Sequence, residues 1–367
     1  MKKLTILVGL AMAMALALPG GAEATALVEV KKLTASDAQA FDTFGWSVAV
    51  SGDTAIVGAY LESAGAPDTG AAYVFQRDQG GTDNWGEVKK LTASDAQATD
   101  WFGISVAVSG DTVVVGSYLE DAGGNTAGAA YVFQRDQGGA DNWGEVTKLT
   151  ASDAQVSDLF GWSVAVSGDK LVVGARFEDA GGSNAGAAYV FERDQGGASN
   201  WGEVTKLTAS DAQAGDWFGE SVAVNGDTVA VGAYLEDAGG SDAGAAYVFQ
   251  RNEGGAGNWG EVKKLTASDA QAGDRFGESV AVSVDTAVVG APREDAGGNG
   301  AGAAYVFRAL KGVGGIAELP EVAGTSRETG GSSGGGKGVL AGVAAAVAGG
   351  TLAMVGAAWY ARRRWAR

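Results

Sequence analysis

The chain has 367 residues, a formal net charge of −18 and 61 glycines, but only 4 prolines and neither cysteine nor histidine. The missing residue types exclude a Ser-His-Asp triad, a cysteine nucleophile, disulfides and ordinary zinc sites. The acidity argues against binding to nucleic acid, because like charges repel. It suits a soluble surface and, at most, contact with cations.

The first 26 residues are typical of a secretory signal. Lys2 and Lys3 precede an apolar run that ends at Pro19, and small residues around Ala24 offer a cleavage site. We therefore expect residues 1–26 to be removed on secretion. An uncleaved membrane anchor is the alternative.

A repeat governs the region that follows. The stretch FGWSVAVSGDTAIVGA at residues 44–59 begins again at Phe102, Phe160, Phe218 and Phe276, each time after 58 residues. Such a fixed period predicts a repeat architecture, and we assign residues 27–310 to one domain of five repeats.

Each repeat contains four segments of strand length that are rich in Val, Tyr, Phe and Thr. In the second repeat the segments are 105–108, 112–116, 129–134 and 145–149, and Gly110 marks a tight turn between the first two. No helical pattern occurs between residues 27 and 310. We predict an all-β fold, a β-propeller of five four-stranded blades.

The phase of the repeat predicts how such a propeller closes. The fourth segment, GEVKKLT at 86–92, recurs in three later repeats but not in the fifth, and a shortened copy opens the domain at 28–34. We expect this N-terminal strand to complete the last blade and remove its exposed edge. An open stack, or an incomplete ring that associates with another chain, remains an alternative.

The C-terminal region indicates attachment to a membrane. A Gly/Ser-rich linker, 311–337, precedes an uncharged segment, 338–361, which is long enough for a transmembrane helix. The basic residues of 362–367 predict a cytoplasmic tail. We expect a single-pass protein at the cell surface with its N-terminal domain outside. A faint sorting signal at 319–323 leaves open processing by a sortase-like enzyme.

The repeats resemble the FG-GAP repeat, the blade unit of the integrin α-chain propeller and of many bacterial or archaeal cell-surface proteins. The resemblance rests on five Phe-Gly pairs and on Gly-Ala-Ala-Tyr-Val-Phe, first found at 70–75, and covers about residues 28–308. It implies an extracellular β-propeller used for adhesion or ligand display. The chain departs from the integrin pattern in having five units rather than seven. It also lacks the DxDxDG loop, so calcium binding is not carried over, and we expect no cofactor.

Residues that differ between repeats are the candidates for specificity. Large aromatic and arginine side chains next to Phe-Gly, or after the second strand, suit a binding face, whereas packing between blades is the competing interpretation. The predicted ligand-binding residues are Trp46, Tyr60, Trp101, Tyr118, Trp162, Arg176, Trp217, Tyr234 and Arg275.

Three sets of carboxylates also repeat, and each has a structural and a chemical interpretation. They are suited to capping turns, but a ring of them would also suit cation binding or general acid/base catalysis. The sets are Asp37, Asp95, Asp153, Asp211 and Asp269; Asp42, Asp100, Asp158, Asp216 and Asp274; and Glu62, Glu120, Glu178, Glu236 and Glu294.

Together these patterns predict a non-catalytic propeller, anchored at the cell surface, that binds extracellular proteins or glycans through a multivalent face. Near-identical repeats offer no unique catalytic blade. A hydrolase or lyase that uses the ring carboxylates, and a lectin with one sugar site per blade, are the alternatives. The sequence leaves the identity of the ligand open.

Overall fold

The computed structural model describes residues 29–63, 65–195, 197 and 200–309. The predicted signal, linker, transmembrane helix and basic tail lie outside these residues, as do residues 27 and 28. Within the described part of the chain, no helix is long and apolar enough to cross a membrane.

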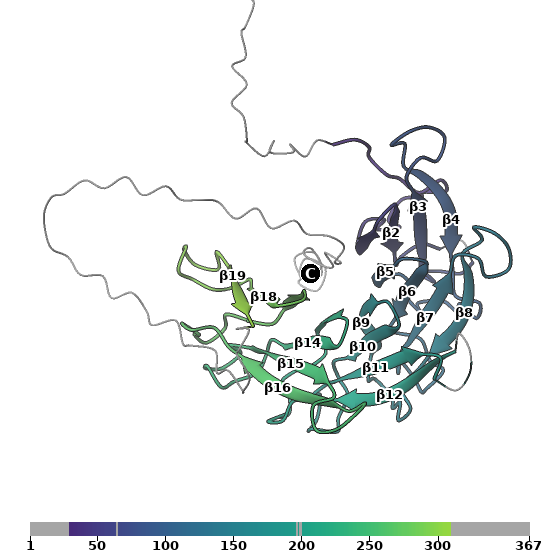
Figure 1. Ribbon diagram of the computed structural model, residues 1–367. Coiled ribbons are helices and arrows are strands. Elements are labelled where there is room, and N and C mark those ends of the chain that lie inside the picture. Colours follow the sequence, from purple (N-terminus) through teal and green to yellow (C-terminus); the bar gives the residue numbers. More distant parts are fainter. Residues whose placement is uncertain (1–28, 64, 196, 198–199, 310–367) are drawn as a thin grey trace, which may run out of the picture. The chain divides into compact units, whose positions relative to one another are not determined.

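The described residues form nineteen strands and no helix, in five antiparallel sheets that follow one another along the chain (Figure 1). All five sheets lie in the unit that begins at Leu33. The strands of the first four sheets are β1 (Val48–Ser51), β2 (Thr54–Ala59), β3 (Ala71–Gln76) and β4 (Gly86–Leu91); β5 (Ser105–Ser109), β6 (Thr112–Ser117), β7 (Ala129–Gln134) and β8 (Gly144–Leu149); β9 (Phe160–Ser167), β10 (Lys170–Ala175), β11 (Ala187–Arg193) and β12 (Trp201–Leu207); and β13 (Ser221–Asn225), β14 (Thr228–Ala233), β15 (Ala245–Arg251) and β16 (Trp259–Leu265).

The fifth sheet has three strands, β17 (Ser279–Val282), β18 (Thr286–Ala291) and β19 (Ala303–Arg308). The all-β prediction and the division into five sheets are confirmed, and the strand bounds of the second repeat agree within one residue. Ring closure is not shown. Residues 29–34 form no strand, and β19 pairs only with β18 among the described residues.

Each sheet is a meander whose turns follow from the repeat. A glycine with positive φ occupies the first hairpin turn of the first four sheets, as at Gly110 (φ 56°), where an L side chain is rarely tolerated. The register then alternates side chains between the two faces. A one-residue irregularity separates Val132 from Phe133 in the pairing of β7 with β8, and it recurs in the other three four-stranded sheets.

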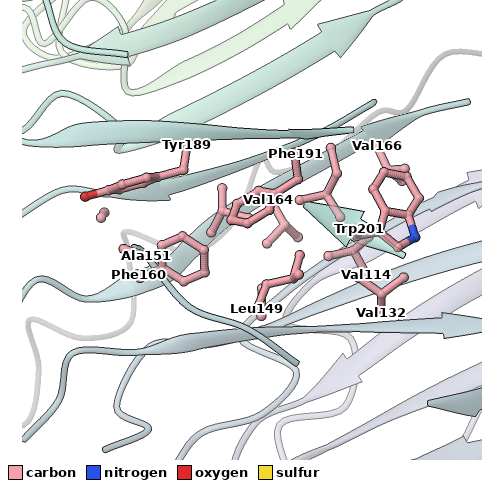
Figure 2. Packing of buried hydrophobic residues seen from close by; sticks show 14 of the residues in the cluster. Val114, Val132, Leu149, Ala151, Phe160, Val164, Val166, Tyr189, Phe191 and Trp201 are labelled. Atoms are coloured by element: carbon pink, nitrogen blue, oxygen red, sulfur yellow. The ribbon is translucent and has the colours of Figure 1, made fainter. Parts of the chain in front are cut away.

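The core lies between successive sheets and not within any one of them. Figure 2 shows one such layer, in which Leu149 from β8 lies near Phe160 of β9, and Val114 and Val132 of the same sheet as Leu149 lie near Trp201 of β12. Both faces of an interior sheet are therefore buried, which explains its near-continuous apolar strands. Val113, Val114 and Val115 on β6 are all fully buried.

Phe-Gly is the link between neighbours. Phe102 is fully buried, and its backbone lies so close to Gly70 that a side chain at Gly70 would overlap it. Gly103 donates its N–H to Gly116 of its own sheet, while its carbonyl accepts from Ser47 of the preceding sheet. The five-fold conserved pattern within this chain is thus a packing requirement.

Candidate functional site

The nine predicted ligand-binding residues form one unbroken row of contacts. The rings of Trp46 and Tyr60 lie 4.8 Å apart, and Tyr60 lies 5.1 Å from Trp101 of the next sheet. Trp101 then meets Tyr118 at 5.6 Å, and Tyr118 meets Trp162 at 4.8 Å. We call the nine residues the aromatic row.

The row continues through two arginines. The guanidinium of Arg176 lies 3.2 Å from the ring centroid of Trp162 and 4.8 Å from that of Trp217. Trp217 lies 5.5 Å from Tyr234, whose ring is 5.0 Å from the Arg275 guanidinium. Order along the row follows order along the chain, because the first four sheets each contribute a residue beside Phe-Gly and the residue after the second strand, and the fifth contributes Arg275.

The residues of the aromatic row pack against one another, but most of them remain partly exposed to solvent. Tyr118 and Tyr234 are buried, at 8% and 7% exposure, and the other seven members are partly buried. Ile104 and Leu159 form the apolar floor beneath the first half. The packing interpretation is therefore supported by geometry, while seven of the nine residues remain partly exposed.

The backbone just before Phe-Gly is held in an uncommon conformation. Trp101, Trp217 and Arg275 have φ values of 58°, 57° and 60°, in the left-handed region where bulky residues are rare. The N–H of Trp101 donates to the carbonyl of Asp68 on the preceding repeat, and the equivalent bond holds Trp217 to Asn184. Thr43 and Leu159, at the equivalent positions, have φ values of 58° and 59°, so this conformation belongs to the repeat and not to the aromatic row alone.

Charged residues distinguish the second half of the row. Arg176 donates to a Glu220 carboxylate oxygen at 3.0 Å, and Arg275 lies 3.8 Å from Glu278. Burial raises the pKa of Glu220 even though Arg176 opposes the shift. The Nε atoms of Arg176 and Arg275 are buried without a hydrogen-bond partner within the described residues. These Nε atoms lie beside the Trp162 and Tyr234 rings, so the guanidinium groups are held in the row by stacking on the rings as well as by the two glutamates.

Phe177 belongs to this site but was not among the predicted residues. Its ring lies 4.8 Å from the Arg176 guanidinium and 4.9 Å from the Trp217 ring. Three of the other repeats have leucine at this place, for example Leu119. That departure from the repeat is the sequence signal that points to it.

The first carboxylate set is part of a repeated ion network. In the second repeat, Tyr131 donates to Asp95 at 2.8 Å, and Lys148 of β8 bridges Asp95 and Glu120 at 2.7 Å each. The same arrangement occurs in the first, third and fourth repeats, and burial together with the Asp95 hydrogen bond raises the pKa of Tyr131. The lysine ammonium group binds the carboxylate oxygens that a metal cation would otherwise need as ligands.

The second carboxylate set caps a turn. Asp100 accepts the N–H of Gln97 at 2.7 Å and is buried. Burial raises the pKa of Asp100, Asp158 and Asp216 to about 6 each, and neighbouring carboxylates add to the effect. The third set also caps, since Glu120 accepts the N–H of Ala122. The turn-capping interpretation is confirmed for these sets.

Nothing in the described residues gathers three acidic side chains in a way that would hold a metal ion. The hairpin aspartates that replace the calcium loop are paired instead, as Asp111 is with Arg135 at 3.3 Å. A surface groove of about 470 Å³ lies away from the row, between Lys264 and Asp269.

Comparison with known proteins identifies the repeats. The family model described as the FG-GAP repeat matches residues 27–75, 85–133, 143–191, 201–249 and 259–307, which together make up more than half of the chain. No curated protein matches the chain.

Proposed function

Because the chain belongs to the FG-GAP repeat family, we propose that it is a non-catalytic binding protein of the cell surface. Its sheets act as a β-propeller whose aromatic row contacts an extracellular protein or glycan. The predicted signal (1–26), linker (311–337) and transmembrane helix (338–361) place and hold it there. No nucleic acid and no cofactor takes part.

The observation that carries the proposal is the continuity of the row. Nine aromatic and arginine side chains, selected from the positions that vary between repeats, make contact in sequence across all five sheets. Partly exposed Trp and Tyr rings provide flat apolar area, and Arg176 and Arg275 provide donors, which together suit sugar rings or a peptide. Several modest contacts along one row bind with avidity.

The remaining features of the proposal concern the last sheet. Residues 28–34 repeat the sequence of β4, and we retain the prediction that they form the fourth strand beside β19. For the repeated carboxylates we propose a structural role: Lys148 and its equivalents bridge the first and third sets in four repeats, and the second set caps turns.

Binding is tested with the full chain on a glycan array and on a panel of immobilised extracellular matrix proteins. Trp101→Ala removes the ring that links the first two sheets, and we expect at least a tenfold loss of binding. Trp85→Ala is the matched control, since Trp85 is partly buried and packs against Arg77 outside the row. The role of the row would be refuted if the Trp101→Ala and Trp85→Ala chains bound equally well. It would also be refuted if the unmodified chain bound neither the glycan array nor the protein panel.

A further inference from the structure

Four junctions join the five sheets, and all four contain the same hydrogen bond from a serine hydroxyl to a backbone carbonyl. The hydroxyl at the start of the first strand donates to the Phe-Gly carbonyl of the next sheet, as Ser47 does to Gly103 at 2.8 Å. The three later junctions repeat this bond at 2.8 to 2.9 Å: Ser105 to Gly161, Ser163 to Gly219 and Ser221 to Gly277.

The two ends of the array carry the unmatched halves of a fifth such junction. On the last sheet, a Cβ added to Gly290 would meet only Ser279 of the same sheet, whereas one at Gly232 would overlap the Gly277 carbonyl. Gly45 on the first sheet is equivalent in the repeat to Gly277. No neighbouring atom lies within 4 Å of a Cβ added to Gly45, so this end is open. The backbone on both sides is shaped for a neighbour.

The apolar faces at the two ends are exposed in the same complementary way. Val48 on β1 is 48% exposed, although the equivalent Val106 on β5 is buried against the preceding sheet. Val306 on β19 is 70% exposed, although the equivalent Val190 is fully buried. Each face is the copy of one that an interior junction covers.

Charge completes the match. In the second repeat, Glu145 of β8 accepts from Ser94, and Lys148 bridges Asp95 and Glu120. Sheet five has the corresponding Ser268, Asp269 and Glu294 but no fourth strand. The sequence EVKKL at 29–33 places Glu29 and Lys32 at the spacing of Glu145 and Lys148. This segment therefore carries the acceptor and the cation that sheet five needs.

We infer that these surfaces belong to an interface between two copies of the chain. The last sheet of one copy takes residues 28–34 of a second copy as its fourth strand, and the first sheet of that second copy covers its apolar face. This inference rests on the proposal that residues 28–34 form the fourth strand beside β19, and it adds that a second copy of the chain supplies that strand. In the described residues of one chain Val48 and Val306 are both exposed, so both faces are open to a second copy. A head-to-tail contact of this kind continues into a larger ring or a filament.

A disulfide tests the source of the strand, because the chain has no cysteine of its own. Val74 pairs with Lys89 in the register of β3 with β4, so Val306 is expected to pair with Lys31. Directly opposed residues of antiparallel strands are within reach of a disulfide. Full-length Lys31→Cys and Val306→Cys chains with different tags are mixed and oxidised. We expect a covalent dimer that carries both tags.

Four further samples make each outcome decisive. A chain with both Val74→Cys and Lys89→Cys shows that this register forms a disulfide. Val156→Cys, on an exposed loop, replaces Lys31→Cys to measure random collision, and each single variant is oxidised alone. A chain carrying Lys31→Cys and Val306→Cys reports closure within one molecule.

A two-tag dimer well above the Val156→Cys background supports the interface between copies. An intrachain disulfide without a two-tag dimer overturns it and leaves the closing strand intact. If neither forms while the β3–β4 control does, both the interface and the closing strand are wrong.

Discussion

The third and fifth sheets share nearly the same sequence but not the same surroundings. Val190 on β11 is fully buried, and Val306 at the same place on β19 is 70% exposed. The third sheet is covered on both faces and has four strands, whereas the fifth is covered on one face and has three. The difference shows that a repeat of this type does not complete its own core, because stability comes from the neighbour.

The largest expected difference in stability between the third and fifth sheets is at one equivalent valine, Val190 or Val306. Val190→Asp places an unpaired carboxylate in a closed apolar layer and is expected to cost about 4 kcal/mol of unfolding free energy or more. Val306→Asp is expected to change the stability of the monomer by less than about 0.5 kcal/mol, because its face is open. Urea unfolding followed by tryptophan fluorescence measures both. Similar losses would show that the two faces are equally covered.

The ion network gives the next largest difference. Lys148→Met leaves Glu120 buried beside Asp95 without its lysine, which is expected to cost about 3 kcal/mol. Among the described residues no lysine is paired with Glu294 of the fifth sheet, so Glu294→Gln, which keeps the cap to Ala296, is expected to be close to neutral. Glu120→Gln is the matched interior variant and should be destabilising. Thermal unfolding of the three variants measures these losses of stability. If the glutamate acted only through its own turn cap, Glu120→Gln and Glu294→Gln would be equally destabilising.

The capping aspartates predict a dependence on pH. The folded-state pKa of Asp158 is raised to about 6 from an ordinary value of 3.8, so the folded protein binds the proton more tightly. Its contribution to stability is complete below the unfolded pKa and is lost as the pH rises through about 6. Asp158→Asn keeps an oxygen for the N–H of Gln155 and should raise stability at pH 8 by about 1 kcal/mol.

Asp100→Asn and Asp216→Asn should behave in the same way, because these two groups have the same raised pKa. The three substitutions together should flatten the stability profile between pH 4 and 7. Guanidinium titrations at several pH values give the profile. A mutant profile as steep as that of the parent chain would contradict the assignment.

The smallest expected effect concerns the bond at each junction. Ser221→Ala removes the hydroxyl that reaches Gly277 at 2.9 Å and leaves a buried carbonyl with one bond fewer, at a cost of about 1 kcal/mol. Ser279→Ala at the open end should have no effect on the isolated chain. If the copies associate as inferred, the same Ser279→Ala should weaken that association, as measured by analytical ultracentrifugation.

Sequence reasoning predicted the parts of the fold that repeat. The 58-residue period gave five sheets, and β-branched runs with Gly110 between them gave β5 and β6 within one residue. The nine variable side chains were identified, but their order as one row was not, because ring contacts between sheets depend on how the sheets stack. The role of Phe177 and the orientation of Lys148 toward Glu120 likewise depend on three-dimensional neighbours.

The open ends were the least predictable feature. A copy of the β4 sequence at 28–34 indicates that a fourth strand is available, but sequence spacing alone does not say to which molecule it is added. The exposure of Val48 and Val306 shows that both end faces are open, and the disulfide experiment tells which molecule supplies the strand.

The docking of each Phe-Gly onto the preceding sheet has a consequence for synthesis. The hydroxyl of Ser47 finds its acceptor only when Gly103 has been made, 56 residues later. Each of the first four sheets therefore lacks one of its contacts until the start of the next repeat is available, so a chain that emerges N-terminus first, from a ribosome or across a membrane, can complete its sheets only in order. A nascent chain arrested one repeat short exposes the same kind of face that the finished protein carries on its last sheet.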